Sequence, residues 1–211
     1  AGGTLMADHL AVLDTADICF VLGEHVEAGK DVNRTLGDYV KHHKSRMVGF
    51  AAINPVKDKI NHRTLSFIKR DLGLAGIVIY CPDYGCHPTH SRAMRLYETA
   101  EELGMPIFFH NCGTLEANAV LDFAQPYLLD EVARTFGNLK IIIGSMGVPF
   151  VEQAIYLAAK HPNVFIDMTL SPQRVWEVYN CIIRAYERQV MGKLLFGSGY
   201  PLGEPQADRK S

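Results

Sequence analysis

Residues 140–169 read KIIIGSMGVPFVEQAIYLAAKHPNVFIDMT, and this stretch decides the fold class. It contains two short apolar runs, KIIIG and VFIDM, and the second is separated from the first by residues 150–160. That intervening segment repeats apolar side chains at helical spacing, so it predicts an amphipathic helix. Nearly continuous apolar runs are typical of parallel strands that are covered on both faces. The stretch therefore predicts a strand, a helix and a second strand parallel to the first.

The same alternation continues on both sides of this stretch. Further apolar runs occur at 18–22, 47–53, 76–80, 106–110 and 193–197. The clearest other amphipathic segments are 92–103 and 175–191. Seven strands that alternate with helices predict a parallel α/β fold. The sequence shows no internal repeat and no long linker, so residues 1–211 are expected to form a single domain.

Two arrangements of these elements remain open. Seven strands are one fewer than an eight-stranded barrel requires, and residues 5–16 have helical character where a barrel normally opens with a strand. We expect either an open doubly wound sheet or a (β/α)₈ TIM-like barrel whose first strand is missing from the chain. An exposed edge beside residues 18–22 would favour aggregation. A partner chain, as in a homo-oligomer, or the N-terminal segment is therefore expected to cover it.

The composition argues against several classes of partner. The formal net charge is −2 and the basic residues are scattered, so neither nucleic acid nor an anionic membrane is an expected partner. No apolar run reaches about 18 residues, the length of a membrane span. The N-terminus does not resemble a signal peptide. The five cysteines are spread through the chain and odd in number, which favours a reducing cytoplasm over a disulfide framework.

His110 is the most informative candidate at the strand ends, where parallel barrels carry their chemistry. It closes the apolar run PIFFH and begins a loop that contains glycine. A neutral imidazole at this place can ligate a metal or transfer a proton near neutral pH. The alternative is a histidine at the edge of the core that a backbone carbonyl satisfies. Spacing alone favours that structural alternative.

Other side chains near the strand ends give weaker predictions. The segment CPDYGCHPTH offers four zinc-ligand types, but its spacing favours a loop beside a pocket; the four are Cys81, Cys86, His87 and His90. Cys112 could act as a nucleophile with His110 only if the strand continued, and Gly113 argues against that. Glu24 and His25 could contribute a carboxylate and an imidazole to a pocket, but a solvated loop is favoured. Asp167 alternates toward the barrel interior, where a carboxylate must be paired, and it could equally serve a structural hydrogen-bond network.

Several segments together resemble the amidohydrolase-related group of metal-dependent hydrolases, which includes decarboxylases of aromatic and muconate-type acids. The matching segments are MVGFAAINP, GLAGIVIYCPDYGCHP, LYETAEELGMPIFFHNCGT, residues 124–169 and KLLFGSGYPLGEP. They are collinear over most of residues 12–205, and 124–169 is the most specific. The resemblance implies a distorted (β/α)₈ barrel with a divalent metal, often zinc, at its C-terminal face. It also implies a small organic acid or amide as substrate.

The resemblance further implies where functional groups should stand. The family carries a His-x-His pair on strand one and single histidines at the ends of strands five and six. Strand eight ends in an aspartate. His110 matches the strand-five metal ligand, whereas Ser145 stands at the strand-six histidine and Gly199 at the strand-eight aspartate. By this resemblance, we expect the chain to begin too late to hold the strand-one pair.

These departures imply impaired catalysis. The Ser145 hydroxyl has too high a pKa to act as a base at neutral pH, and Gly199 has no side chain that could accept a proton. Loss of a general base alone slows a reaction by about 10²–10⁴-fold. We therefore expect either a weakened hydrolase or decarboxylase of this family, or a non-catalytic barrel retained for binding a ligand or a partner.

Overall fold

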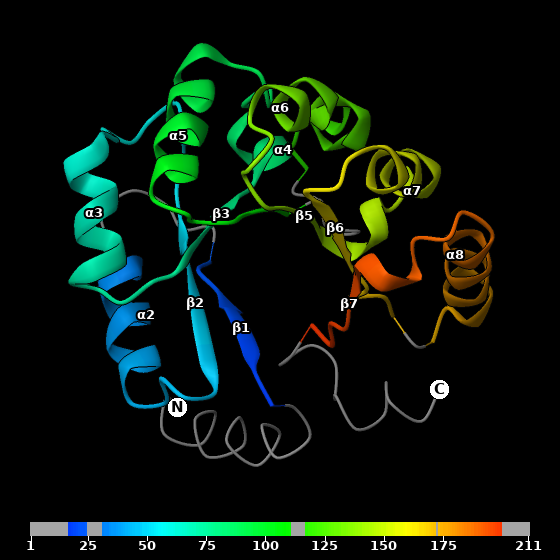
Figure 1. Cartoon of the computed structure of the whole chain (residues 1–211), viewed down its shortest axis with the longest axis horizontal. Coiled ribbons are helices and arrows are strands. Elements are labelled where there is room, and N and C mark those ends of the chain that lie inside the picture. The colour runs from blue at the N-terminus through cyan, green and yellow to red at the C-terminus, as the bar shows by residue number, and fades with distance from the viewer. Residues whose placement is uncertain (1–16, 25–30, 111–116, 172, 200–211) are drawn as a thin grey trace.

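The computed structural model describes residues 17–24, 31–110, 117–171 and 173–199. Seven parallel strands form one sheet in chain order, and all seven predicted strands are confirmed. The strands are β1 (Cys19–Leu22), β2 (Met47–Ala52), β3 (Gly76–Ile79), β4 (Ile107–Phe109), β5 (Ile141–Ile143), β6 (Val164–Asp167) and β7 (Leu194–Leu195). The sheet curves, and the long helices lie around its outer side (Figure 1). The fold is thus a partial (β/α)₈ barrel and not a doubly wound sheet.

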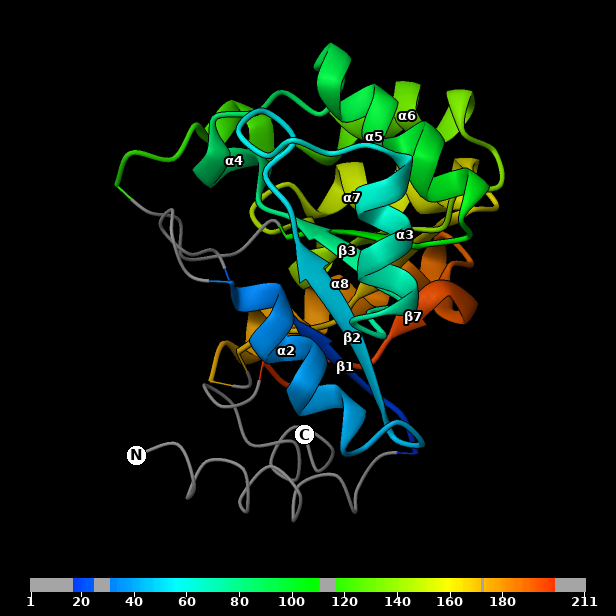
Figure 2. The same ribbon diagram turned by 90° about the vertical axis from the view of Figure 1, so that its left-hand side faces the viewer.

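Helices follow the strands as the sequence predicts. The α-helices are α2 (Val32–Lys41), α3 (His62–Arg70), α4 (Cys81–Tyr84), α5 (Ser91–Glu102), α6 (Asp130–Thr135), α7 (Val151–Lys160) and α8 (Val175–Glu187). Four 3₁₀ turns complete the described elements: η1 (Leu121–Ala124), η2 (Pro126–Leu129), η3 (Gly144–Gly147) and η4 (Met191–Lys193). Figure 2 shows α2 and α3 side by side along the outside of β2. Within the described ranges, no helix is long and apolar enough to cross a membrane.

The helix predicted at residues 175–191 ends earlier in the structure. The apolar spacing continues to Met191, but α8 ends at Glu187. Gln189 has a φ of 58°, in the left-handed region, and such a residue cannot continue a right-handed helix. The helix expected at residues 5–16 lies outside the described residues.

The core has two layers, one on each side of the sheet. Alternate strand residues such as Ile77, Ile107 and Ile141 face outward and pack under the helices. The residues between them face the concave side and form a smaller cluster of Phe50, Val78, Tyr80, Phe108 and Ile142. Successive strand residues point to opposite faces. Because both faces are buried, the strands appear in the sequence as continuous apolar runs.

Asn33 on α2 holds the end of β2. Its Nδ2 donates to the carbonyl of Ala52 at 2.9 Å, and its Oδ1 accepts the Ala52 N–H at 2.8 Å. The neighbouring strand β1 pairs only as far as Leu22 with Phe50. The Asn33 amide therefore satisfies the backbone groups of Ala52 that lie beyond this pairing.

We predict that Asn33→Ala lowers the free energy of unfolding by about 2 kcal/mol, because two half-buried backbone groups lose their partner. Asn33→Asp keeps the acceptor and loses the donor, so it should cost roughly half as much. Urea unfolding followed by circular dichroism measures both. Wild-type stability in the alanine variant would show that Asn33 does not support β2.

Candidate functional site

His110 lies at the carboxyl end of β4 and faces the concave side of the sheet. Its backbone N–H donates to the Ile79 carbonyl at 2.9 Å, so the ladder between β3 and β4 extends to this residue. The centre of its ring lies 4.5 Å from that of Tyr80 and 6.1 Å from that of Phe108. Both aromatic rings belong to the concave-face cluster. His110 is therefore held between aromatic rings at the inner rim.

Burial lowers the pKa of His110 from its ordinary value of 6.5 to about 4. An imidazolium loses hydration when it is buried, and this favours the neutral ring. At neutral pH His110 is thus an uncharged imidazole. It can accept a proton or offer a lone pair, but it carries no positive charge that could pair with a carboxylate.

Tyr80 closes the concave side between β3 and the end of β1. Its buried Oη donates to the carbonyl of Gly23 at 2.6 Å. The two residues are 57 positions apart, and no sequence pattern pointed to this contact. The hydroxyl spans β2, which lies between the two strands. Tyr80 therefore fixes the end of β1 and also forms part of the surroundings of His110.

Ser145 lies in the tight turn η3 that follows β5. Its φ and ψ are 50° and 42°, and those of Met146 are 54° and 14°, so two successive non-glycine residues are left-handed. Such backbone costs of order 1–3 kcal/mol per residue and persists only where other contacts hold it. Here the Ser145 N–H donates to Asp167 Oδ2 at 3.0 Å, while the Met146 side chain is fully buried. The Ser145 hydrogen bond and the buried Met146 side chain together hold the turn in this conformation.

Asp167 at the end of β6 is a buried carboxylate with several donors. Its Oδ1 accepts the Thr169 hydroxyl at 2.8 Å, and its Oδ2 accepts the N–H groups of Ser145 and, at 3.3 Å, of Thr169. Burial raises the pKa of this carboxyl above 3.8, although these hydrogen bonds oppose the shift. Both carboxylate oxygens are occupied by the protein itself, so the contacts support the structural interpretation of Asp167.

Gly197 and Gly199 follow β7 and lie against the same residues. A Cβ added at Gly197 would stand 2.1 Å from both Asp167 Oδ1 and Thr169 Oγ1. Gly199 has a φ of 64°, and a Cβ there would lie 2.9 Å from Thr169 Cγ2. Ser145 and Gly199 therefore approach one pair, Asp167 and Thr169, from the two neighbouring strands. The sequence did not indicate Thr169 or Gly197.

Ser145 and Gly199 lie against neighbouring residues at the end of β6, Asp167 and Thr169 respectively. His110 follows β4, which lies beside β5 in the sheet. Phe109 pairs with Ile143 across β4 and β5, so the residues after them, His110 and Gly144, stand at the same level of the rim. A cavity shared by His110, Ser145 and Gly199 stays a prediction.

Four of the remaining sequence candidates are either buried in the core or accept a backbone N–H. Cys81 and Cys86 are buried in the core, and burial raises the pKa of the Cys86 thiol to about 11. His87 Nδ1 accepts the Thr89 N–H at 3.1 Å, and His90 Nδ1 accepts the Arg92 N–H at 3.2 Å at the start of α5. Glu24 is exposed. His25 and Cys112 lie outside the described residues.

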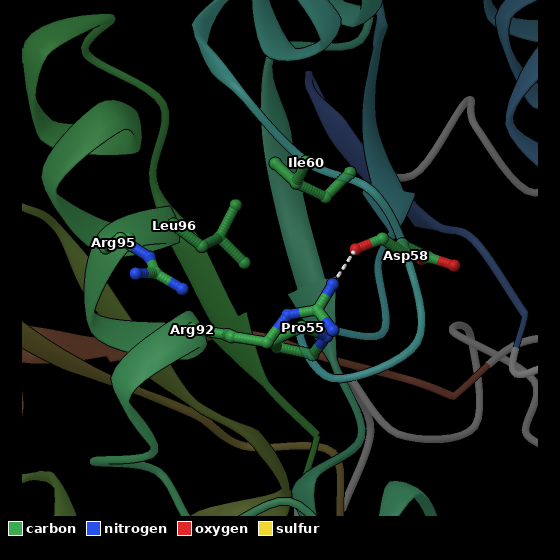
Figure 3. Close-up of a pocket in the computed structure, with 6 residues that line it drawn as sticks. All are labelled: Pro55, Asp58, Ile60, Arg92, Arg95 and Leu96. Carbon is green, nitrogen blue, oxygen red and sulfur yellow. Dashed lines mark hydrogen bonds between the residues drawn. The ribbon is translucent and has the colours of Figure 1, made fainter.

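A small pocket whose lining contains none of these candidate residues lies between the loop after β2 and α5 (Figure 3). Its lining consists of Pro55, Asp58, Ile60, Arg92, Arg95 and Leu96. The Arg92 guanidinium donates to the Asp58 carbonyl at 2.8 Å, which occupies part of its hydrogen-bonding capacity. The volume is about 40 Å³, enough for water but not for an organic acid. This pocket is therefore not a candidate substrate site.

The described donors do not form a divalent-metal site. Across the described ranges, no three His, Cys, Asp or Glu side chains are placed to hold one ion. A catalytic zinc takes about three protein ligands. His110 is a suitable donor, but Ser145 and Gly199 are not, and the Asp167 oxygens already accept hydrogen bonds. These residues alone do not fit the metal that the family resemblance implies.

Comparison with known proteins gives one family and one fold. A sequence model described as amidohydrolase matches residues 6–210. Comparison with curated proteins gave no significant match. An uncharacterised TIM-barrel protein from Bordetella bronchiseptica superposes with a TM-score of 0.76 at 18% identity, covering 99% of this chain and 74% of that chain.

Two decarboxylases have the same fold at low identity. For 2,6-dihydroxybenzoate decarboxylase from Rhizobium, the TM-score is 0.68 at 15% identity, with 95% of this chain and 79% of that chain covered. For 5-carboxyvanillate decarboxylase from Novosphingobium aromaticivorans, which holds manganese, it is 0.68 at 15%, with 96% and 73% covered. At these identities, the superpositions show a shared fold only.

Proposed function

This chain belongs to the amidohydrolase family, and from that membership we propose that it binds a small organic acid at its strand ends and transforms it slowly or not at all. The observation that carries the proposal is the chemistry of two positions. Ser145 and Gly199 stand where the family resemblance places a histidine and an aspartate; Ser145 contacts Asp167, and Gly199 lies against Thr169. The site thus lacks two of its expected proton-transfer or metal-binding groups.

The proposed substrate class is a small carboxylic acid with an unsaturated ring. Two similarly folded enzymes are named for aromatic acids, 2,6-dihydroxybenzoate and 5-carboxyvanillate. The concave side of this chain is itself lined with rings, since Tyr80 and Phe108 flank His110. Aromatic side chains favour planar apolar ligands through offset or edge-to-face contacts. We propose either hydrolysis or decarboxylation of such an acid.

The residues present support limited proton chemistry. His110 is neutral at neutral pH and can accept a proton from a bound acid or water. Asp167 is held by Ser145 and Thr169, so its role in this proposal is to fix the turn after β5. When bound, a divalent ion supplies charge stabilisation to such reactions. The donors within the described residues do not fit such an ion.

We expect the double variant Ser145→His/Gly199→Asp to bind Mn²⁺ or Zn²⁺ at least about tenfold more tightly than wild type, a gain of about 1.4 kcal/mol. Both positions are left-handed, with φ values of 50° and 64°. Histidine and aspartate tolerate this region better than most residues, but a Cβ at Gly199 lies 2.9 Å from Thr169 Cγ2, so the Thr169 side chain must shift in this variant. Calorimetric titration measures the binding, and assays with 2,6-dihydroxybenzoate and 5-carboxyvanillate measure turnover.

The matched control is Ser145→Gln/Gly199→Asn, which adds polar side chains of similar size without an imidazole or a carboxylate. It should bind metal no better than wild type. Tight stoichiometric metal and efficient turnover in the unmodified chain would contradict the proposal. The site would then have to use other groups, with Glu24, His25, His87 and Asp167 as the first to test. Binding of the acids without turnover, even in the double variant, would favour a non-catalytic barrel.

A further inference from the structure

Two cysteines lie at the two ends of the turn that terminates the short helix α4, directly after β3. The Cys86 N–H donates to the Cys81 carbonyl at 3.0 Å, and the Gly85 N–H donates to the Pro82 carbonyl at 3.2 Å. Gly85 is left-handed, with a φ of 57°. These two hydrogen bonds make a Schellman motif, in which the side chains of the first and last residues pack against each other. The turn therefore favours contact between the side chains of Cys81 and Cys86.

The separation of these two cysteines suits a disulfide. Their backbone hydrogen bond of 3.0 Å holds the two Cα atoms within about 7 Å of each other. Disulfides join Cα atoms that are about 4.4–6.8 Å apart. Both side chains are 1% exposed and belong to the core layer under the helices. Burial raises the pKa of the Cys81 thiol well above its ordinary value, and the charge of Cys86 raises it further, as expected of neighbouring sulfurs.

Tyr97 on α5 brings a third ionisable group to this turn. Its hydroxyl is fully buried and has no hydrogen-bond partner among the described residues. Burial raises the pKa of Tyr97 well above its ordinary value, and the charges of Cys81 and Cys86 raise it further, so the phenol lies near both sulfurs. Phe109 and Phe136 pack edge to face against its ring. A phenol that stays protonated can donate a hydrogen bond to a thiolate.

We propose that Cys81 and Cys86 form a reversible disulfide that locks this turn, with Tyr97 as the hydrogen-bond donor to the reacting sulfur. The oxidant is a small disulfide such as oxidised glutathione. The Cys86 thiolate attacks one sulfur of the oxidant, which forms a mixed disulfide and releases one small thiolate. Cys81 then attacks the Cys86 sulfur and releases the second small thiolate. The two cysteine protons pass to these leaving groups, so the cysteine pair loses two electrons and the oxidant gains them.

Cys86 attacks first in this scheme because its surroundings are more open. Gly85 before it is exposed and His87 after it is half-buried, whereas both neighbours of Cys81 are buried. The Cys86 thiol donates to the His87 carbonyl at 3.5 Å, and this bond breaks when the thiolate forms. Burial raises the pKa of Cys86 to about 11, so little thiolate is present at neutral pH. The rate of oxidation should therefore rise about tenfold per pH unit between pH 7 and pH 9.

The disulfide would also hold a segment that rests on the turn. The Pro82 carbonyl accepts the Val120 N–H at 3.0 Å, so the turn supports the chain before η1. Oxidation should slow hydrogen exchange of the Cys86 and Val120 amides by at least about threefold, because both hydrogen bonds open less often. The Met105 amide is the control, since it donates to the Ala100 carbonyl at 2.8 Å in a similar turn after α5 and should not change.

Equilibration with mixtures of reduced and oxidised glutathione, in buffer and in denaturant, tests the proposal. Alkylation of the remaining thiols and peptide mass spectrometry identify the bonded pair. The equilibrium constant for the Cys81–Cys86 bond should be at least about tenfold larger in the folded chain, because the turn holds the sulfurs together. A variant with alanine in place of Cys19, Cys112 and Cys181 should give the same result. If that variant does not fold, peptide mapping of wild type gives the same comparison.

Tyr97→Phe tests the role of the phenol. It should slow disulfide formation in the folded chain by at least about threefold and leave the equilibrium constant unchanged, since the hydroxyl stabilises a transient thiolate. Tyr127→Phe, at an exposed tyrosine of η2, is the control and should react like wild type. A Cys81–Cys86 bond that forms only in denaturant, or pairing of either residue with another cysteine, would overturn the proposal. An unchanged rate in Tyr97→Phe would overturn the role of Tyr97.

Discussion

Replacing Gly197 by alanine is expected to lower the free energy of unfolding by about 3 kcal/mol. The added Cβ would stand 2.1 Å from Asp167 Oδ1 and from Thr169 Oγ1, and neither atom can yield easily. The carboxylate is held by three donors, and the side chain of Thr169 is β-branched and stiff. Overpacking costs about 1–3 kcal/mol, and a lost hydrogen bond to a charged group adds about 1.5–3 kcal/mol.

Gly192→Ala is the matched control, because a Cβ at that glycine of η4 meets no atom within 4 Å. Guanidinium unfolding of both variants gives the comparison, and only the Gly197 variant should lose stability. A further readout is the NMR signal of the Ser145 amide, which should shift when Asp167 moves. Equal stability of the two alanine variants would show that the ends of β6 and β7 are loosely packed.

The fold was predictable because its main signal is local. Each strand is a short apolar run, since the helices cover one face of the sheet and the ring cluster around Phe108 covers the other. The same reasoning located His110 at a strand end. It could not choose between a barrel and a doubly wound sheet, because curvature depends on how all seven strands twist together.

The partners of the site residues were not predictable, because their contacts join distant parts of the chain. Asp167 reaches the Ser145 N–H across 22 positions, and this contact exists only because the residue after β5 turns left-handed. Serine gives no sequence signal for that conformation, unlike glycine. The need for a residue without Cβ at Gly197 also follows from the register of β6 and β7, which pairs Asp167 with Leu195.

The second large effect concerns pH. We expect metal-free wild type to lose up to about 3 kcal/mol of stability through His110 as pH falls from 6.5 to 4. Burial lowers the folded-state pKa of His110 from 6.5 to about 4. In this window the unfolded chain binds a proton that the folded chain does not, so protonation favours unfolding. A depression of about 2.5 units corresponds to roughly 3 kcal/mol at 1.36 kcal/mol per unit.

Asp167 contributes to the pH dependence of stability with the opposite sign to His110. The experiment must therefore separate the two contributions. Its folded-state pKa is raised above 3.8 by burial, so its contribution is fully present below 3.8 and is lost as pH rises through the folded-state value. The difference between wild type and His110→Gln removes this shared background. The variant keeps a polar planar side chain and does not titrate.

Urea unfolding of EDTA-treated wild type and His110→Gln, repeated between pH 7 and pH 4, gives the stability difference at each pH. It should change by up to about 3 kcal/mol, with wild type losing more on acidification. His62→Gln, at an exposed histidine of α3, is the control and should follow wild type. A difference that does not change with pH would mean that the His110 ring reaches water. His110 would then be an ordinary surface histidine, and the aromatic surroundings that support a neutral imidazole at this strand end would not exist in solution.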